Sequence, residues 1–205
     1  RLGQIFLNLQ EQGAHNINLV TPSHYAPQIA TALRKVRNDL KIPVVFNGSG
    51  YESEEILQEV KGLLDIYLTD LKYFDSAKSA RYSAASDYFS VASDAVKEMY
   101  RQVGACQFSS EGLLQRGLIL RHLVLPCGKD DSIALLRWIA GNFSTENIRV
   151  SLMRQYTPMP GLPAPFDRTV TDDEYDAVLS WMYLNDLEGF TQEADAADSQ
   201  FIPDF

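Results

Sequence analysis

The stretch DIYLTDLKYFD, residues 65–75, joins an apolar, β-prone run to charged residues that follow it directly. The run predicts a buried strand over 64–69, and Asp70 and Lys72 come next, two residues apart. Because side chains alternate along extended backbone, this carboxylate and this ammonium are expected on one face. The stretch therefore predicts a strand that ends in a charged pair.

Helical and extended patterns alternate on both sides of this strand, which predicts an α/β fold with a parallel sheet and right-handed crossovers. Helices are expected at 1–12, 27–40, 52–61, 76–83, 87–103, 130–142 and 172–187. Strands are expected at 16–20, 43–46, 64–69, 118–125, 148–153 and, as a short last one, 189–193. We expect a single domain over 1–205, in which 189–205 form a C-terminal tail. The helical pattern begins at Arg1 itself, so we expect a piece of a longer protein that lacks its N-terminus.

The composition of the chain argues against nucleic-acid-binding, membrane-associated and disulfide-rich classes of protein. The 205 residues carry 18 Lys and Arg against 27 Asp and Glu, a net charge of −9, which argues against a nucleic-acid partner. No apolar run has the length of a membrane span, so no membrane partner is expected. The two cysteines, Cys106 and Cys127, form no disulfide framework, and a reducing cytoplasm is the simplest setting.

Polar side chains stand at the ends of five expected strands, where parallel α/β proteins bind their ligands. They are Thr21, Ser23 and His24; Asn47 and Ser49 in NGSG; Asp70 and Lys72; Arg121 and His122; and Arg154, Gln155 and Tyr156. Polar residues at five strand ends favour one shared polar binding site for a small anionic or zwitterionic ligand.

Several of these groups have a structural alternative. Asp70 and Lys72 either form an ion pair that closes the end of the sheet or bind the ligand. NGSG is either a turn before a helix or a loop whose glycines let backbone amides approach a ligand. Arg121 is either a satisfied arginine of the sheet or a carboxylate clamp. His24 and His122 with Asp70 are a weaker option for a metal site, because their spacing matches no ligand motif.

The motifs GAHNINLVTPSHY, VVFNGSGYES, DIYLTDLKYFD, YRQVG, RHLVLP, SLMRQYTP and the tail GFTQE…FIPDF resemble the radical S-adenosylmethionine (radical SAM) superfamily. The branch they resemble is that of iron–sulfur proteins similar to pyruvate formate-lyase-activating enzyme. The resemblance covers nearly the whole chain, and its tail implies a complete C-terminus. It implies a partial, TIM-like (β/α)6 barrel in which a CxxxCxxC loop after the first strand holds a [4Fe–4S] cluster.

The resemblance also implies an activity and partners. The cluster binds SAM and cleaves it reductively to a 5′-deoxyadenosyl radical, with electrons from a donor such as flavodoxin or ferredoxin. In activating enzymes the radical is passed to a glycyl-radical enzyme; in other relatives it attacks a small-molecule substrate.

Site residues follow from the resemblance by position. Thr21, Ser23 and His24 stand where many relatives have Gly-Gly-Glu, which contacts the SAM amine. Asn47 and Ser49 match a loop that lines the SAM site, Asp70 and Lys72 match an Asp-Leu-Lys whose lysine holds SAM, and Arg121 matches an arginine of the equivalent strand. Gln155 or Tyr156 falls where activating enzymes have a SAM-contacting histidine.

The main departure is that these 205 residues contain no CxxxCxxC, and the two cysteines lie 21 positions apart. We therefore expect a barrel without its first strand and cluster loop, with no catalytic residue, no cluster and no activity of its own. Its free edge at 16–20 also makes dimerisation an expectation. Two alternatives remain open: a degenerate, cluster-free barrel that binds a metabolite or a protein, and an aldolase-like enzyme with Lys72 as a Schiff-base lysine.

Overall fold

The computed structural model describes residues 1–193 and is built on one seven-stranded, mostly parallel sheet. The strands β1, β2, β3, β5, β6 and β7 lie side by side in that order and pair in parallel, while the short β4 pairs antiparallel with β5. Their bounds are β1 Ile17–Val20, β2 Val44–Gly48, β3 Ile66–Asp70, β4 Gln107–Phe108, β5 Leu114–Leu123, β6 Arg149–Met153 and β7 Gly189–Phe190. The parallel α/β prediction is confirmed.

Helices connect the parallel strands. Their bounds are α1 Leu2–Glu11, the short 3₁₀ helix η1 Pro22–Tyr25, α2 Ala26–Val36, α3 Glu54–Glu59, α4 Ser76–Ser83, α5 Tyr88–Val103, α6 Lys129–Asn142 and α7 Asp172–Leu184. In residues 1–193, none of these helices is long and apolar enough to cross a membrane. Residues 194–205, most of the expected tail, lie outside the described residues.

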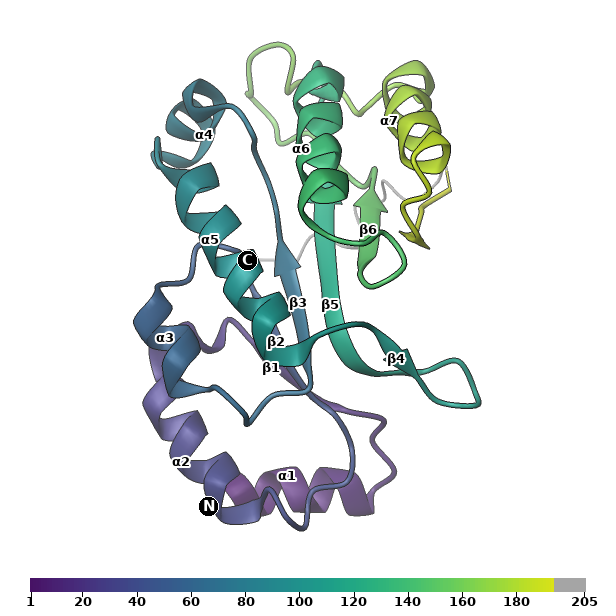
Figure 1. Cartoon of the computed structure of the whole chain (residues 1–205). Helices are drawn as coiled ribbons and strands as arrows, with labels where there is room; N and C mark the ends of the chain where they lie inside the picture. Colours follow the sequence, from purple (N-terminus) through teal and green to yellow (C-terminus); the bar gives the residue numbers. More distant parts are fainter. Residues whose placement is uncertain (194–205) are drawn as a thin grey trace.

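The strand order places the helices on one side of the sheet. When consecutive parallel strands advance in one direction through right-handed crossovers, every connecting helix falls on the same face. Figure 1 shows α5 and α6 in front of the sheet and α3 to the left of its strands. The core fills the space between these layers, with Tyr67 and Leu118 fully buried there. The described strands do not close on themselves, so the sheet is an open, partial barrel.

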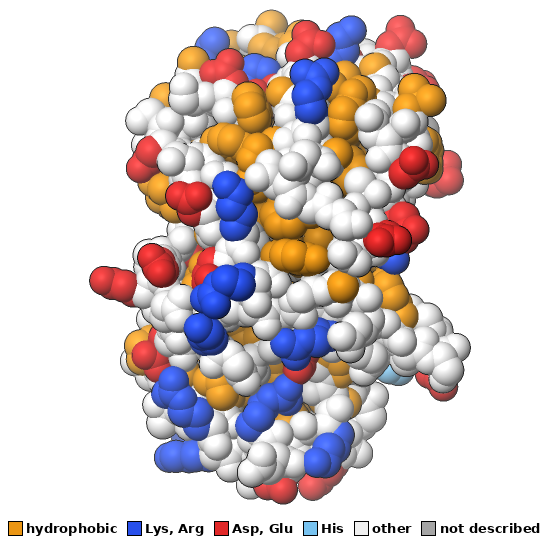
Figure 2. All heavy atoms as spheres, viewed as in Figure 1, with side chains coloured by type: hydrophobic (Ala, Val, Ile, Leu, Met, Phe, Trp, Pro, Cys, Tyr) orange, Lys and Arg blue, Asp and Glu red, His pale blue; other side chains and the backbone are white. Residues whose placement is uncertain are grey.

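The helix-covered face carries both signs of charge. Figure 2 shows Lys and Arg side chains gathered over the part of the molecule where α1, α2 and α3 lie, interrupted by Asp and Glu. Arg34 of α2 pairs with Glu59 of α3, and Arg37, just after α2, pairs with Asp65, just before β3. These two arginines therefore hold neighbouring segments of the chain together.

The largest difference from the prediction lies before β5. This strand begins at Leu114 instead of residue 118, and its first part forms a hairpin with β4, which the prediction lacked. Gly117 makes the hairpin possible, because its φ is +133° and a Cβ there would lie 2.7 Å from the Cys106 sulfur. Such a close contact between distant residues leaves no periodic signal in the sequence.

Several helices are shorter than predicted, among them the two on either side of β2. The helix expected at 27–40 spans Ala26–Val36: it begins directly after η1, which Pro22 starts, and a turn replaces its predicted last residues. The helix expected at 52–61 spans Glu54–Glu59, because the Ser53 side chain accepts a hydrogen bond from the Ile56 amide and caps it.

Candidate functional site

Three charged side chains meet at the carboxyl ends of β3 and β5. Asp70 ends β3 and is paired in register with Arg121 of β5. The Asp70 Oδ1 atom lies 2.8 Å from Arg121 Nη2, and its Oδ2 atom lies 3.6 Å from Lys72 Nζ. The structural ion pair considered from the sequence is therefore present, and it includes Arg121. One carboxylate between two cations leaves a net positive charge for an anionic group.

These charges form one wall of a hollow of about 300 Å³, which we call the charged hollow. Leu123, Leu125 and Met153 supply an apolar wall, and Tyr73 also lines it. Within the described chain, the buried Nε of Arg121 has no hydrogen-bond partner. An unsatisfied buried donor is costly, and the residues 1–193 supply no acceptor for this N–H. The charged hollow suits a molecule with charged groups and an apolar part.

The predicted residues after β1 and β2 form a neighbouring group that is held by Glu52. Ser49 donates its backbone N–H and its hydroxyl to Glu52 Oε1, at 3.0 and 3.2 Å. Ser23 donates its hydroxyl to the same oxygen at 3.5 Å. Both serines therefore brace these two loops through their hydrogen bonds to one carboxylate. His24 is exposed on η1 and takes no part in this group.

Glu52 was not predicted as a site residue, although it is only 4 % exposed. Its second oxygen, Oε2, has no partner among residues 1–193. Burial raises the pKa of the Glu52 carboxyl, and the hydrogen bonds from the Ser49 amide and hydroxyl partly oppose that effect. The sequence placed this residue in the acidic first turn of a helix, where nothing distinguishes a buried glutamate from an exposed one.

Tyr88, also missed, connects the loops after β2 and β3. Its buried hydroxyl accepts a hydrogen bond from the Lys72 amide at 3.1 Å and lies 3.0 Å from the Ser49 carbonyl oxygen, to which it donates. The Asp70 carbonyl oxygen lies 3.3 Å away. This phenol therefore positions the backbone that carries both Asp70 and Lys72. A tyrosine at the start of a helix gives no sequence signal of that role.

The structure places Gln155 and Tyr156 away from the lining of the charged hollow. The Gln155 amide oxygen accepts a hydrogen bond from Gln192 at 2.7 Å, and the Tyr156 hydroxyl donates to the Phe166 carbonyl at 2.9 Å. Arg154 pairs with Asp172 at 2.6 Å and so contacts the start of α7. A role for Gln155 or Tyr156 in ligand binding stays a prediction. The same holds for Thr21, whose amide donates to the carbonyl of Asn47.

His122 points to the helix side of the sheet, opposite its neighbour Arg121. Its Nδ1 lies 2.7 Å from the Leu71 carbonyl oxygen and its Nε2 lies 2.8 Å from Ser132 Oγ. Because a carbonyl only accepts, Nδ1 carries the proton and Nε2 accepts from the serine. Burial lowers the pKa of His122 and keeps the ring neutral. The metal site with His24 and Asp70 is wrong, because these contacts occupy both ring nitrogens of His122.

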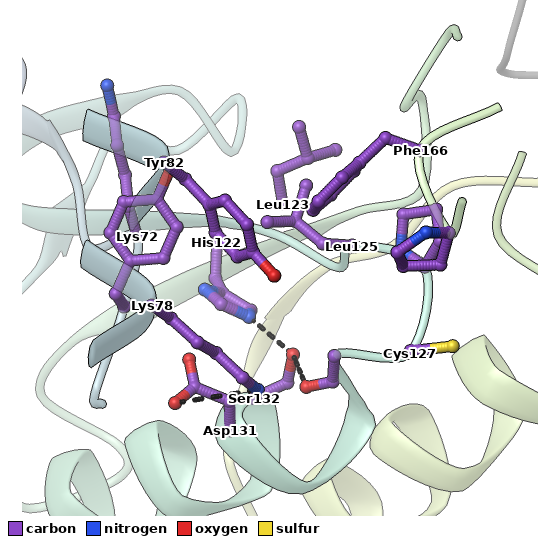
Figure 3. Close-up of a pocket in the computed structure, with 14 residues that line it drawn as sticks. Lys72, Lys78, Tyr82, His122, Leu123, Leu125, Cys127, Asp131, Ser132 and Phe166 are labelled. Carbon is purple, nitrogen blue, oxygen red and sulfur yellow. Dashed lines mark hydrogen bonds and ion pairs between the residues drawn. The ribbon is translucent and has the colours of Figure 1, made fainter. Parts of the chain in front are cut away.

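A smaller hollow lies beside the charged one and shares Lys72 and Tyr73 with it. Figure 3 shows Tyr82 and Phe166 on one side of it and Asp131 and Ser132 of α6 on the other. Asp131 accepts hydrogen bonds from the backbone amides of Phe74 and Asp75, so this carboxylate organises the loop after β3. Cys127 lies at the rim and is exposed.

The two cysteines lie near opposite ends of β5. Cys106 packs against Gly117 in the first half of the strand, and Cys127 follows the carboxyl end of the strand. Across the described residues, no three His, Cys, Asp or Glu side chains are grouped as a metal site requires. The thiols of this chain therefore do not fit a [4Fe–4S] cluster, which needs several thiolates in one place. The charged hollow, in contrast, presents one carboxylate and two cationic side chains.

Comparison of the sequence with known proteins gives a partial match. No protein-family model matches the chain. An uncharacterized protein of Methanocaldococcus jannaschii is 31% identical over 121 residues, which are 58% of this chain and 31% of that protein. The chain thus spans about a third of the length of this curated relative.

Two solved structures have a similar fold. A domain of pyruvate-formate lyase-activating enzyme from Bacteroides vulgatus superposes with a TM-score of 0.57 and 11% identity, over 87% of this chain and 98% of that domain. Methylornithine synthase (PylB) superposes with a TM-score of 0.52 and 14% identity, over 94% of this chain and 63% of that one. The chain therefore has the fold of a domain of pyruvate-formate lyase-activating enzyme, in agreement with the family that its motifs resemble.

Proposed function

We propose that this chain is the SAM-binding part of a radical SAM enzyme and that the charged hollow holds polar groups of SAM. The observation that carries the proposal is the meeting of Asp70, Lys72 and Arg121 at the carboxyl edge of the sheet. Asp70 can accept hydrogen bonds from a ligand in the hollow, while the Lys72 ammonium and the Arg121 guanidinium, which line the same hollow, can donate to one. When bound at a reduced cluster, SAM supplies a carbon-centred radical.

In this proposal the cluster ligands come from outside these 205 residues, because Cys106 and Cys127 lie too far apart along β5 to share a cluster. We therefore expect the chain alone to be inactive. Two free thiols support a cytoplasmic setting. The finer proposal, that the parent protein activates a glycyl-radical enzyme and takes electrons from flavodoxin or ferredoxin, rests on its motifs and on its similarity to the activating-enzyme domain.

Equilibrium dialysis of the chain with radiolabelled SAM tests the proposal. Loss of a charged hydrogen-bonding partner costs about 1.5–3 kcal/mol, so Arg121→Gln and Lys72→Gln should each weaken binding about tenfold or more. Arg149→Gln is the matched control, because Arg149 lies on β6 and pairs with Glu188, outside the lining of the charged hollow.

Two results would contradict the proposal. One is the absence of SAM binding to the wild-type chain; the other is an equal loss in the Arg149→Gln control. If another small metabolite bound instead and Arg121→Gln abolished its binding, the cluster-free binding module would be the better interpretation. Iron and sulfide analysis after anaerobic reconstitution addresses the cluster separately: a stoichiometric [4Fe–4S] signal on this chain would refute our assignment of its ligands to another segment.

A further inference from the structure

Three tyrosine rings form a continuous path from the charged hollow to the surface, which we call the tyrosine row. Tyr73 lines the hollow and is 8 % exposed, Tyr88 is 3 % exposed, and Tyr51 reaches the surface with 43 % of its area exposed. The Tyr73 and Tyr88 ring centroids are 5.6 Å apart in an edge-to-face contact. Tyr88 and Tyr51 are 5.9 Å apart and stacked, with only 8° between their planes.

The row draws its members from three separate segments of the chain. Tyr73 follows β3, Tyr88 begins α5, and Tyr51 follows β2. Ring contacts of this kind add to stability by their packing alone. Packing does not, however, explain the different surroundings of the three hydroxyl groups, and these surroundings determine which ring can lose an electron.

A phenol that loses an electron becomes a strong acid, so its oxidation proceeds readily only where a base can take the proton. The Tyr51 hydroxyl donates to the carboxylate of Asp87, with 2.7 Å between the oxygens. The Tyr88 hydroxyl has only backbone partners, and burial raises its pKa. The Tyr73 hydroxyl accepts from Ser83, which is no base. The outermost ring is therefore the one at which a radical would come to rest, and Tyr88 serves as a bridge.

We propose that the tyrosine row is a one-electron path that carries oxidising equivalents from the charged hollow to Tyr51 at the surface. The source of the oxidant, a carbon-centred organic radical in the hollow, rests on the proposed function. Such a path would let the protein discharge a radical that failed to react with its substrate, before that radical attacked neighbouring side chains.

The carbon-centred radical takes one electron and the phenolic proton from Tyr73 and becomes a closed-shell compound with a new C–H bond. Tyr73 then regains an electron from Tyr51, which tunnels through the Tyr88 ring, and a proton from water in the hollow. Tyr51 gives its own proton to Asp87, which releases it to solvent and so replaces the proton that water gave to Tyr73, and Tyr51 remains as a neutral radical. A thiol in solution donates a hydrogen atom to Tyr51, which restores the phenol and leaves a thiyl radical.

A tethered photo-oxidant tests the path without SAM or a cluster. Cys127 and Tyr73 line the same small hollow, and Cys127 is exposed, so a ruthenium polypyridyl complex attached to this thiol faces the inner end of the row. Cys106→Ser leaves a single thiol for labelling. Flash excitation with an irreversible cobalt(III) quencher creates the oxidant, a radical trap captures the product, and peptide mass spectrometry locates it.

The trap adduct should be concentrated on Tyr51. Tyr25 and Tyr183 are the controls, because they are 65 % and 60 % exposed and take part in no aromatic pair found within residues 1–193. The untethered complex should label tyrosines according to exposure and so give the reference pattern. Asp87→Asn should reduce the Tyr51 adduct several-fold, since the amide accepts no proton, and its side chain makes no helix-capping bond that the change would remove. Tyr88→Leu should reduce it similarly by removing the bridge.

The proposal fails if the tethered complex labels Tyr25 and Tyr183 as strongly as Tyr51. It also fails if Asp87→Asn leaves the Tyr51 adduct unchanged, a result that does not depend on whether Tyr88→Leu folds. Because no SAM is present, either failure leaves the proposed function untouched. Conversely, absence of SAM binding would remove the source of the oxidant but not the path itself.

Discussion

At the scale of single residues, Glu52 shows how a buried charge is held next to the candidate site. One carboxylate oxygen accepts hydrogen bonds from Ser49 and Ser23, while the other has no partner in the described part of the chain. A buried carboxylate with an unsatisfied oxygen favours the protonated form in the folded state. Glu52 therefore makes the stability of the loop after β2 sensitive to pH.

The sign of this sensitivity can be predicted. The folded pKa of Glu52 is raised above its ordinary value of 4.5, so above that value the folded state binds more protons than the unfolded state. The free energy of unfolding should therefore fall as pH rises from 4.5 through the raised pKa. Urea denaturation at a series of pH values should show this slope in the wild type and a flatter one in Glu52→Gln. Glu55→Gln, at an exposed position, should keep the wild-type slope.

At the scale of elements, the loop between β2 and α3 is packed directly against the end of β3. Gly50 has φ of +85°, and a Cβ there would lie 2.1 Å from the Asp70 carbonyl oxygen and 3.1 Å from the Tyr88 hydroxyl. Gly50 of NGSG thus serves a close approach of backbone to backbone, whereas Gly48 leaves room for the side chains of Glu52 and Phe46. This contact and the Tyr88 hydroxyl together set where Asp70 and Lys72 stand.

Two alanine substitutions distinguish the free-energy cost of a steric clash from the cost of left-handed backbone strain. Gly62 has φ of +75° and no atom within 4 Å of a Cβ, so Gly62→Ala should cost only the left-handed strain, about 1–2 kcal/mol. Gly50→Ala carries the same strain and also displaces β3, so its loss in the free energy of unfolding should be clearly larger and SAM binding should weaken. Urea denaturation of both variants checks this, and equal losses would show that the loop yields without cost.

At the scale of the whole molecule, the open sheet leaves β1 with one neighbour among the described strands. The Ile17 and Thr21 amides donate to the β2 side, so alternation directs the amides of Asn18 and Val20 to the free edge. Val20 is also 68 % exposed. A free edge of this kind pairs readily with another strand, and we propose a second copy of the chain as its partner.

Sedimentation velocity tests this pairing. Val20→Pro removes a donor from the free edge without removing a bond to β2, so it should shift a dimer to monomer. Leu184→Ser is the control for non-specific hydrophobic association, since Leu184 is 83 % exposed. It lies on α7, which leads into β7, and β7 is at the other end of the strand order from β1. A wild-type chain that stays monomeric at high concentration, or a dimer lost only in Leu184→Ser, would exclude pairing through β1.

The parallel α/β architecture could be predicted from the sequence, because hydrophobic periodicity and helix caps are local properties of the chain. The sequence also placed Asp70, Lys72 and Arg121 at one edge, since strand ends of a parallel sheet share an edge. Alternation along β5 contained one further signal that the prediction did not use: adjacent side chains face opposite sides, so His122 could not share the hollow with Arg121.

Which polar groups are satisfied by the protein, and which are left for a ligand, depends on contacts that form when the chain folds. Ser23 and Ser49 meet Glu52, His122 meets Ser132, and the β4 hairpin depends on Gly117. The tyrosine row joins segments that follow β2 and β3 to the start of α5. Such contacts join residues that are distant in the chain or have no periodic relation, so they arise from packing and leave no mark on the local pattern of residues.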